Sequence, residues 1–377
     1  MKNVLIAGYV RSPFHFAAKG ALARVRPDDM LAAVIQGLLQ KTGVPGGDIE
    51  DLLVGCAMPE GEQGLNVARL TGLLAGLPQS VAGATINRFC GSSMQAIHTA
   101  AGAIQLGAGE AFICAGVESM SRVPMGGFNP LPNPKLAAES QAYISMGETA
   151  ENLARKYKIG RDRQEKLAVD SHARAAAAEA AGRLAEEIVP IAAGNQRVEK
   201  DGCIRPGTDL KILAELKPAF DEKGTVTAGT SSPLTDGAAA TLVVTEDYAK
   251  AHGLRALAKL KSIAVAGCAP EIMGIGPVEA THKALKRAGL ALKDIDVIEL
   301  NEAFAVQALA CMDELGIDWS RTNIDGGAIA IGHPLGATGA RITGKAAAIL
   351  KREGKGFALS SQCIGGGQGI TTVLEAV

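Results

Sequence analysis

A stretch of sequence near the start of the chain recurs near its end, and this repeat limits the folds open to the chain. Residues 43–58 (GVPGGDIEDLLVGCAM) match residues 289–304 (GLALKDIDVIELNEAF) at a constant offset of 246. Each copy follows an amphipathic helical pattern and leads through an Asp-Ile-acidic turn into an apolar run. Phe112 and Phe357 open two further similar strands at an offset of 245. The first and last thirds are therefore predicted to be two copies of one structural unit.

Short apolar runs alternate with helical patterns along the chain, which predicts an α/β fold with largely buried sheets. We expect strands over residues 3–8, 51–57, 111–116, 241–245, 257–265, 296–300, 357–361 and 370–374. We expect helices over residues 28–42, 66–75, 91–106, 277–288, 302–315 and 337–351. The chain has 46 Gly and 65 Ala but only 13 aromatic residues. Small side chains fill little space between distant elements, so we expect tightly spaced layers.

The middle of the chain differs from both repeats. Residues 122–140 contain four prolines, and two helical patterns follow, at 149–158 and from Asp162 onward. Asp162 and Glu165 resemble a capping box, with Gly160 ending the helix before it. We interpret 119–232 as an insertion that projects from the first half. The expected domains are an N-terminal half (1–118 plus 233–256), this insertion (119–232) and a C-terminal half (257–377).

Charge and cysteine content exclude several classes of function. The formal net charge is -1, and no run of five Lys or Arg occurs, which argues against nucleic acid or an anionic membrane as main partner. No stretch predicts a membrane span or a targeting leader, so we expect a cytoplasmic protein. The seven cysteines are scattered without a CxxC pair, which predicts free thiols rather than disulfides or a metal site.

Cys90 lies in the segment 87–93 (NRFCGSS), immediately before the uncharged helix predicted at 94–106. The N-terminus of a helix presents unpaired N–H groups and the positive end of the dipole, which lower the pKa of a thiol. This placement would make Cys90 a nucleophile. Without charges, the helix is expected to be buried on all sides. The alternative is a cysteine that merely packs beneath a helix cap.

His333 stands in a Gly-rich run, 323–341 (NIDGGAIAIGHPLGATGAR), that also leads into a helix. Glycine permits close approach of a ligand and Pro334 fixes the direction of the chain, so the imidazole is held on a rigid loop. It can serve as a base to a thiol. A phosphate-binding glycine loop is disfavoured because neither GxxxxGK[ST] nor a strand-linked GxGxxG is present.

Two further segments end predicted strands. Cys363 is followed by three glycines (364–367, IGGG), whose free N–H groups suit an oxyanion hole. Asn301 opens the sequence NEAF (301–304) at the carboxyl end of another strand, where ligands of α/β sheets usually bind. A capping role is the simpler interpretation of Asn301, and it is compatible with holding a water.

Together these motifs are specific. NRFCGSS at 87–93, NEAF at 301–304, GGAIAIGHPLGATGAR at 326–341 and CIGGGQG at 363–369, in this order, resemble the thiolase family over essentially the whole chain. The resemblance implies a five-layer αβαβα sandwich of two similar halves, with 119–232 as a CoA-binding loop domain.

The resemblance also implies a role for each residue. Cys90 would take up the acyl group as a thioester, and His333 would activate it and donate to the substrate thioester oxygen, helped by a water on Asn301. Cys363 would exchange a proton with the α-carbon of acetyl-CoA or with the incoming thiol. The N–H groups of Cys90 and Gly365 would form a second oxyanion hole. No metal and no cofactor are implied, with CoA and acyl-CoA as substrates.

In the loop domain, Arg205 matches the family arginine near the CoA adenine, and Ser232, Met146 and Phe220 match positions that line the pantetheine. The acetoacetyl-specific biosynthetic members have His directly before the methionine of this motif, whereas this chain has Ser145. We therefore expect a degradative 3-ketoacyl-CoA thiolase of fatty-acid β-oxidation. An acetoacetyl-CoA-specific acetyl-CoA C-acetyltransferase is the alternative.

The resemblance further implies a homodimer or homotetramer, with a hydratase/dehydrogenase subunit as a possible partner. Two other classes of protein are alternatives to a thiolase. A ketoacyl synthase should have His in place of Asn301 and should lack Cys363. An inert acyl-CoA-binding scaffold subunit is disfavoured by the complete set of Cys90, His333 and Cys363.

Overall fold

The structure, a computed structural model, describes residues 2–377, and strands and helices alternate along it as predicted. The strands are β1 (Val4–Arg11), β2 (His15–Phe16), β3 (Asp51–Gly55), β4 (Ala82–Ile86), β5 (Ala111–Ser119), β6 (Ile191–Ala193), β7 (Gln196–Val198), β8 (Thr235–Thr245), β9 (Ala258–Gly267), β10 (Val297–Leu300), β11 (Phe357–Ile364) and β12 (Gln368–Glu375). Every predicted strand is present. The sequence missed the short strands β2, β6 and β7, and it missed β4, whose residues (AGATI) are too small to give an apolar signal.

The helices also follow the predicted pattern. They are α1 (Pro27–Thr42), α2 (Val67–Leu74), α3 (Ser92–Gln105), α4 (Pro134–Glu139), α5 (Met146–Tyr157), α6 (Arg161–Ala180), α7 (Leu210–Ala214), α8 (Glu246–Ala251), α9 (Gly276–Ala288), α10 (Ala305–Leu315), α11 (Ala328–Ile331) and α12 (Leu335–Arg352), with a 3₁₀ turn η5 (Pro270–Ile275) before α9. Within the part of the chain that the structure describes, no helix combines the length and apolarity needed to cross a membrane.

The sheet has the same strand arrangement in both halves. Its order is β10-β11-β12-β9-β1-β8-β5-β3-β4, so β1-β8-β5-β3 and β9-β12-β11-β10 form two similar runs. They meet only where β1 pairs with β9 at two positions. Asp51 pairs with Phe112 in one half and Val297 with Ala358 in the other, both at an offset of 246. The repeat is therefore present in the pairing register, with Phe112 equivalent to Ala358 rather than to Phe357.

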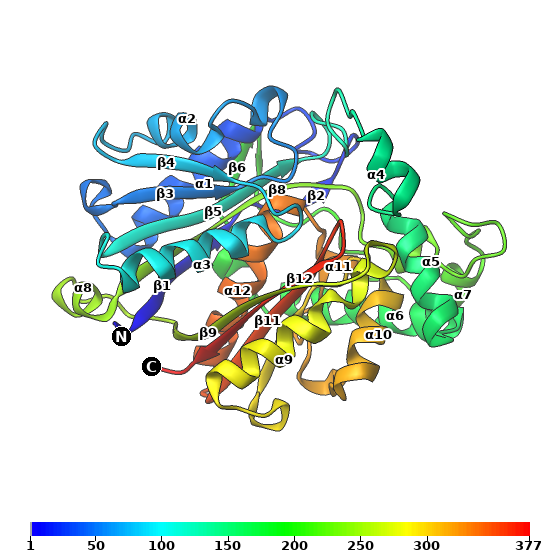
Figure 1. The fold of residues 1–377 in the computed structure, drawn as a ribbon. Helices are drawn as coiled ribbons and strands as arrows, with labels where there is room; N and C mark the ends of the chain where they lie inside the picture. Colours follow the sequence, from blue (N-terminus) through cyan, green and yellow to red (C-terminus); the bar gives the residue numbers. More distant parts are fainter. Residues whose placement is uncertain (1) are drawn as a thin grey trace.

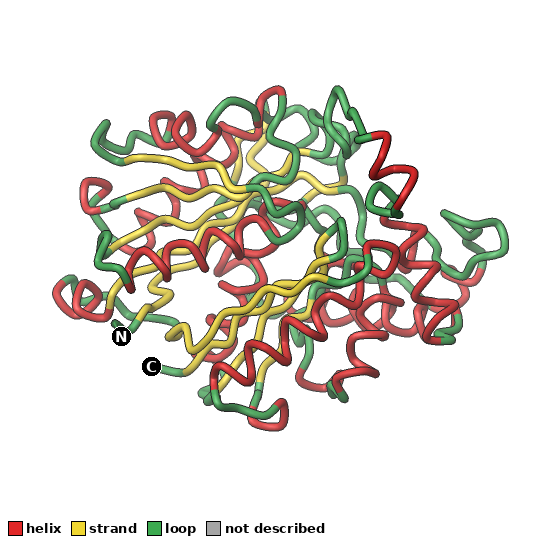
Figure 2. The backbone as a smooth tube through the Cα atoms, viewed as in Figure 1, coloured by secondary structure: helices red, strands yellow, loops and turns green. Residues whose placement is uncertain are grey.

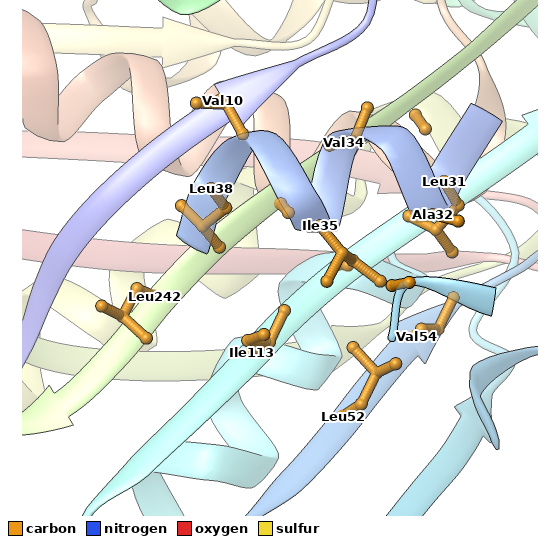
Figure 3. Close-up of a cluster of buried hydrophobic side chains, with 14 of the residues drawn as sticks. Val10, Leu31, Ala32, Val34, Ile35, Leu38, Leu52, Val54, Ile113 and Leu242 are labelled. Carbon is orange, nitrogen blue, oxygen red and sulfur yellow. The ribbon is translucent and has the colours of Figure 1, made fainter. Parts of the chain in front are cut away.

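Helices separate the two runs of strands and cover their outer faces. Figure 1 shows α3 and α12 between β3-β5-β8 above and β9-β12-β11 below, with α9 beneath the lower strands. In Figure 2 the strands accordingly form two groups with helices between them. On the outer face of the first group, α1 packs its apolar side, including Leu31, Ile35 and Leu38, onto Leu52 and Ile113 (Figure 3). This layering agrees with the α/β sandwich expected from the resemblance.

Small residues let the central helices approach each other closely. A Cβ placed on Gly339 of α12 would lie 2.3 Å from the backbone nitrogen of Met94 in α3, and a Cβ on Gly336 would lie 2.6 Å from the Val117 carbonyl. The excess of glycine thus has a structural use in the middle layer. The prediction that α3 is buried on all sides is wrong, because Thr99 and Gly102 are exposed. Uncharged small residues can face water, so absence of charge does not by itself indicate burial.

The insertion leaves the first half after β5 and returns at β8, where Ser119 pairs with Asp236. Its helices α5 and α6 pack against η5, α10 and α11 of the second half, rather than projecting freely from the first. The expected capping box at Asp162 and Glu165 is wrong. Gly160 is the N-cap of α6 without a side-chain bond, and Glu165 pairs with Arg161; the capping box belongs to Ser145 and Glu148 at the start of α5.

Candidate active site

Cys90 lies in a tight turn between β4 and α3. Phe89, just before it, has a left-handed φ of 42°, an uncommon conformation for a non-glycine residue that costs free energy. The turn is held by its own polar groups: the Arg88 N–H donates to Ser92 Oγ at 2.9 Å, and Ser92 Oγ donates to the Phe89 carbonyl at 2.6 Å. These bonds fix Cys90 at the start of α3, one residue before the N-cap Gly91.

The hairpin between β11 and β12 brings its glycines to Cys90. Gly366 and Gly367 have φ values of 79° and 85°, which allow the sharp reversal after Cys363 and Ile364. Gln362 of β11 donates from Nε2 to the Cys90 carbonyl. The backbone N–H of Gly365 donates to the Cys90 thiol. The sequence did not indicate the role of Gln362, which joins the β11–β12 hairpin to the turn that holds Cys90.

Burial dominates the acidity of both cysteines. It raises the pKa of Cys90 to about 11, although hydrogen bonds from the N–H groups of Gly365 and Cys90 itself oppose the rise. The expectation that the helix N-terminus would give Cys90 a low pKa is therefore wrong for the free protein. Cys363 is fully buried, and its thiol pKa is also raised, first by burial and then by the neighbouring Cys90. Both side chains rest as neutral thiols.

His333 is held from three sides at the junction of α11 and α12. Its N–H donates to Thr235 Oγ1 at 3.0 Å, and its Nδ1 lies 2.7 Å from Thr338 Oγ1. The Thr338 hydroxyl donates its only proton to the Pro334 carbonyl at 2.9 Å, so it must accept the proton of Nδ1. Nε2 is then the unprotonated nitrogen, and the Asn301 amide lies 3.4 Å from it. This tautomer leaves His333 able to accept a proton at Nε2.

The imidazole is neutral in the resting protein. Burial, with the positive charge of Arg341, lowers the pKa of His333 to about 3. Its loop reaches the thiol through Leu335, which packs with Cys90 in one apolar cluster. Neutral imidazole and neutral thiol are the states from which a proton can pass from Cys90 to His333 as a substrate carbonyl is attacked.

Asn301 follows β10 and is fully buried. Its backbone N–H donates to the Ser361 carbonyl at 2.9 Å, which fixes it beside β11. Its side-chain Oδ1 is buried without a hydrogen-bond partner among the described residues. A buried acceptor of this kind is costly unless a ligand or water satisfies it. The geometry therefore suits the water-holding role expected for Asn301.

A buried carboxylate that sequence reasoning missed ties the site together. Glu118, at the end of β5, accepts the N–H groups of Ala57, Met58 and Gly336 at 2.8–3.1 Å and the amide of Gln63 at 2.9 Å. All these partners are donors, which suits an ionised carboxylate; burial raises its pKa and the bonds oppose that rise. Because Gly336 is the second residue of α12, Glu118 anchors the start of the helix that follows the His333 loop.

Glu302, in the NEAF motif, is a second buried carboxylate that anchors the His333 loop, through the segment that precedes it. It accepts from Ser171 of α6, from the Asn323 side chain and from the Ile329 N–H of α11, at 2.7–3.2 Å. It therefore joins the insertion to the segment before His333. The family motif indicated this position, but only the structure shows its partners.

Of the four residues expected to bind CoA, Met146 lies beside the glycine hairpin: its Sδ lies 3.4 Å from the position that a Cβ on Gly365 would take. Phe220 and Ser232 lie beside the NEAF segment. Phe220 packs edge to face on Phe304, with ring centroids 5.9 Å apart. The Ser232 N–H donates to the Ala303 carbonyl at 2.9 Å.

Arg205, the fourth, is exposed and contacts other elements. Its guanidinium lies 3.2 Å from His172 of α6 and 6.0 Å from the ring of Phe16 in β2. An exposed guanidinium is free to meet an anionic group. Among residues 2–377, no group of three or more His, Cys, Asp or Glu side chains is arranged to hold a metal ion.

Comparison with known proteins agrees with this geometry. Residues 4–247 match the family described as thiolase, N-terminal domain, and residues 254–376 match thiolase, C-terminal domain. The 3-ketoacyl-CoA thiolase of Bacillus subtilis (strain 168) is 48% identical over 389 residues, with 100% of both chains covered. The boundary between the two matches lies close to the expected start of the C-terminal half.

Two solved structures share the fold over the whole chain. Human mitochondrial 3-ketoacyl-CoA thiolase in complex with CoA has a TM-score of 0.92 and 38% identity, with 100% of this chain and 98% of that chain covered. The Bacillus anthracis acetyl-CoA acetyltransferase has the same TM-score and identity, with coverage of 100% and 99%. Members of the family with either name therefore have this architecture.

Proposed function

Because the chain belongs to the thiolase family and is an acyltransferase, we propose that it cleaves 3-ketoacyl-CoA with CoA in fatty-acid β-oxidation. The products are acetyl-CoA and an acyl-CoA shortened by two carbons. The name of the Bacillus subtilis relative supports the substrate class. The observation that carries the mechanism is the hydrogen bond from Gln362 to the Cys90 carbonyl, which holds Cys363, the next residue of β11, close to Cys90.

In the first half-reaction, Nε2 of His333 takes the Cys90 proton as the sulfur attacks the 3-keto carbon. The bond between C2 and C3 breaks, and its electron pair remains on the two-carbon thioester. Cys363 donates a proton to that carbon, which releases acetyl-CoA and leaves an acyl thioester on Cys90. The buried positions of both thiols exclude water, which would otherwise hydrolyse this thioester.

In the second half-reaction, the Cys363 thiolate takes the proton of a CoA thiol. The CoA sulfur attacks the acyl carbon, and the Cys90 sulfur leaves and recovers its proton from His333. Every proton and electron pair in the two half-reactions is accounted for by the side chains, the backbone N–H groups and CoA.

Two donor sets support the charged intermediates. The N–H groups of Gly365 and Cys90, which already reach the thiol, suit the oxyanion formed on the acyl group. A water on the orphaned Oδ1 of Asn301, together with protonated His333, suits the enolate oxygen of the acetyl thioester. Removing one such donor typically lowers kcat by about 10²–10³.

An acetyltransferase restricted to acetoacetyl-CoA is the second candidate. The fold of the Bacillus anthracis acetyl-CoA acetyltransferase favours it, because that structure is as similar as the human thiolase. The absence of His before Met146 favours the degradative enzyme, since Ser145 stands there as the N-cap of α5. Cleavage rates with 3-ketoacyl-CoA substrates of increasing chain length distinguish them; activity confined to acetoacetyl-CoA contradicts the β-oxidation assignment.

The covalent intermediate has its own test. Brief exposure to acetyl-CoA should add one acetyl group to the peptide that contains Cys90, as seen by mass spectrometry. The Cys90→Ala variant should show no adduct. Binding of acetyl-CoA without any adduct in the wild type would contradict catalysis through Cys90.

We also propose a cytoplasmic homo-oligomer. β4 is an edge strand without charged residues, and the adjacent α2 exposes Leu70, Leu73 and Leu74. Such an edge beside an apolar patch favours pairing with a second copy. A dimer or tetramer fits, and a hydratase/dehydrogenase subunit is a possible further partner. Light scattering of the purified chain determines the oligomeric state, and a monomer would contradict this part of the proposal.

A further inference from the structure

A cavity lies far from the Cys90 and Cys363 thiols, between α1, the 252–257 loop and the C-terminal end of α12. Its volume is about 520 Å³. α12 spans 18 residues, so about 25 Å separate this end from the end that follows His333. The cavity therefore forms no part of the acyl-transfer site.

The wall of this cavity has an excess of positive charge. It contains two carboxylates, Glu186 and Glu187, against six cationic side chains. The cations are Lys41, Arg183, Arg255, Lys345, Lys351 and Arg352. Carboxylates behind the wall pair with some of these cations, so the cations that keep no acidic partner decide whether the cavity attracts anions.

The inner cations have acidic partners. Asp325 accepts from Arg183, Lys345 and Arg352 at 2.7–2.9 Å, and Glu353 also accepts from Arg352 at 2.8 Å. Glu187 is shared between Lys345 and the buried Arg11, which also pairs with Asp201 at 2.6 Å. Although burial opposes it, the surrounding cations hold the pKa of Asp325 at about 2. These ion pairs neutralise the inner wall, so the excess of positive charge lies on the outer cations.

The outer cations are bound to neutral groups. Lys41 Nζ donates to the carbonyls of Tyr9 and Glu186, at 3.2 and 2.7 Å. Lys351 Nζ donates to the carbonyls of Arg255 and Ala256, at 3.4 and 2.7 Å. Each ammonium has three N–H donors, so each keeps one for a ligand. Arg255 is exposed and has no carboxylate partner among the described residues.

We propose that this cavity binds a phosphate-bearing small molecule, with Lys41, Lys351 and Arg255 on the phosphate. The volume of the cavity leaves room for more than the phosphate group itself, so a phosphorylated metabolite fits better than inorganic phosphate alone. The site is separate from the CoA site and does not depend on the proposed reaction.

The proposal is tested by calorimetric titration of the purified full chain with glucose 6-phosphate and with inorganic phosphate, with glucose as the uncharged control. We expect saturable binding of glucose 6-phosphate, weaker binding of phosphate and none of glucose. Raising the KCl concentration should weaken the binding. Arg255→Ala and Lys351→Met should each weaken it about tenfold, the loss expected for one charge-assisted contact. If neither phosphate compound binds, the proposal is wrong.

Two controls separate this cavity from other sites. Lys293→Ala, at an exposed lysine outside the cavity wall, should bind as the wild type does. Arg205→Ala removes the arginine expected near CoA and should also leave binding unchanged. Binding that is lost in Arg205→Ala but kept in Arg255→Ala and Lys351→Met would assign the phosphate to the CoA site and overturn the proposal. Melting curves of each variant show that the fold is retained.

Discussion

Thr338 determines which nitrogen of His333 carries the proton. Its Oγ1 lies 2.7 Å from Nδ1 of the imidazole and donates its own proton to the Pro334 carbonyl. The hydroxyl can therefore only accept from Nδ1–H, and Nε2 is left as the acceptor. The base that we propose for Cys90 needs this tautomer, because only an unprotonated Nε2 can accept the thiol proton.

Replacing Thr338 by Val should lower kcat by about 10–100-fold and leave KM for CoA within about twofold. The isosteric side chain preserves packing but leaves Nδ1–H without an acceptor, which disfavours the required tautomer. Thr338→Ser restores the hydroxyl and should recover most of kcat. Steady-state kinetics with a 3-ketoacyl-CoA measure both; equal losses in the Val and Ser variants would show that only packing matters.

Glu118→Gln should lower kcat by about tenfold or more while making Cys90 easier to alkylate. Each carboxylate oxygen of Glu118 accepts at least two donors, so an NH₂ group in place of one oxygen meets donors and loosens the start of α12. Burial is the main cause of the raised Cys90 pKa, but the charge of Glu118 adds to it. Its removal should therefore lower that pKa.

Rates of iodoacetamide labelling of Cys90 across pH 7–10 compare the thiolate fraction of the Glu118 variant with that of the wild type. The exposed Glu246→Gln variant should match the wild type in labelling and in turnover. An unchanged labelling profile in Glu118→Gln would contradict the electrostatic role, and unchanged kcat would contradict the anchoring role.

Apolar periodicity, a local signal, predicted the alternating strands and helices, and the repeat predicted two similar halves, whereas the five layers were expected from the family resemblance. The pairing of Asp51 with Phe112 and of Val297 with Ala358 follows from the same pattern in both halves. Motifs likewise placed Cys90, His333 and Cys363 at the ends of elements that converge. Glu118 and Gln362 could not be found in this way, because their partners lie in loops and helices distant in sequence and no local pattern encodes them. The acidity of Cys90 was also beyond sequence reasoning, since burial depends on the whole fold.

Cys363→Ala should still form the acetyl adduct on Cys90 but turn over at least about 100-fold more slowly. In the proposed mechanism, acyl transfer from acetyl-CoA to Cys90 uses His333, whereas proton exchange with the α-carbon and with the incoming thiol uses Cys363. Mass spectrometry of the adduct and steady-state kinetics on one preparation separate the two steps. Loss of the adduct in a folded Cys363→Ala protein would argue against this division of roles.

Three buried histidines should make the protein lose stability as the pH falls. Burial lowers the pKa of His98 and His333 to about 3 and that of His172 to about 4. In the unfolded chain each has a pKa near 6.5, so between pH 6.5 and 4 unfolding takes up protons. Stability is fully present above pH 6.5 and falls by up to about 1.4 kcal/mol per pH unit for each histidine.

Urea unfolding between pH 4.5 and 7 measures this slope. His98→Gln keeps a partner for the Thr372 hydroxyl, which lies 2.8 Å from the imidazole, and should reduce the slope by about a third. A slope that is unchanged in this variant would show that His98 is already protonated in the folded protein.

Two glycines of the central helices should respond in opposite directions to alanine. A Cβ on Gly339 would lie 2.3 Å from the Met94 backbone nitrogen, and neither helix can move without disturbing a sheet, so Gly339→Ala should cost about 3 kcal/mol. A Cβ on Gly102 of α3 meets nothing within 4 Å, and its conformation is helical, so Gly102→Ala should add about 0.5–1 kcal/mol. Urea midpoints of the two variants compare these values. Helix propensity alone favours alanine at both positions. Equal effects of the two substitutions would therefore show that Gly339 is not needed for the close approach of α3 and α12.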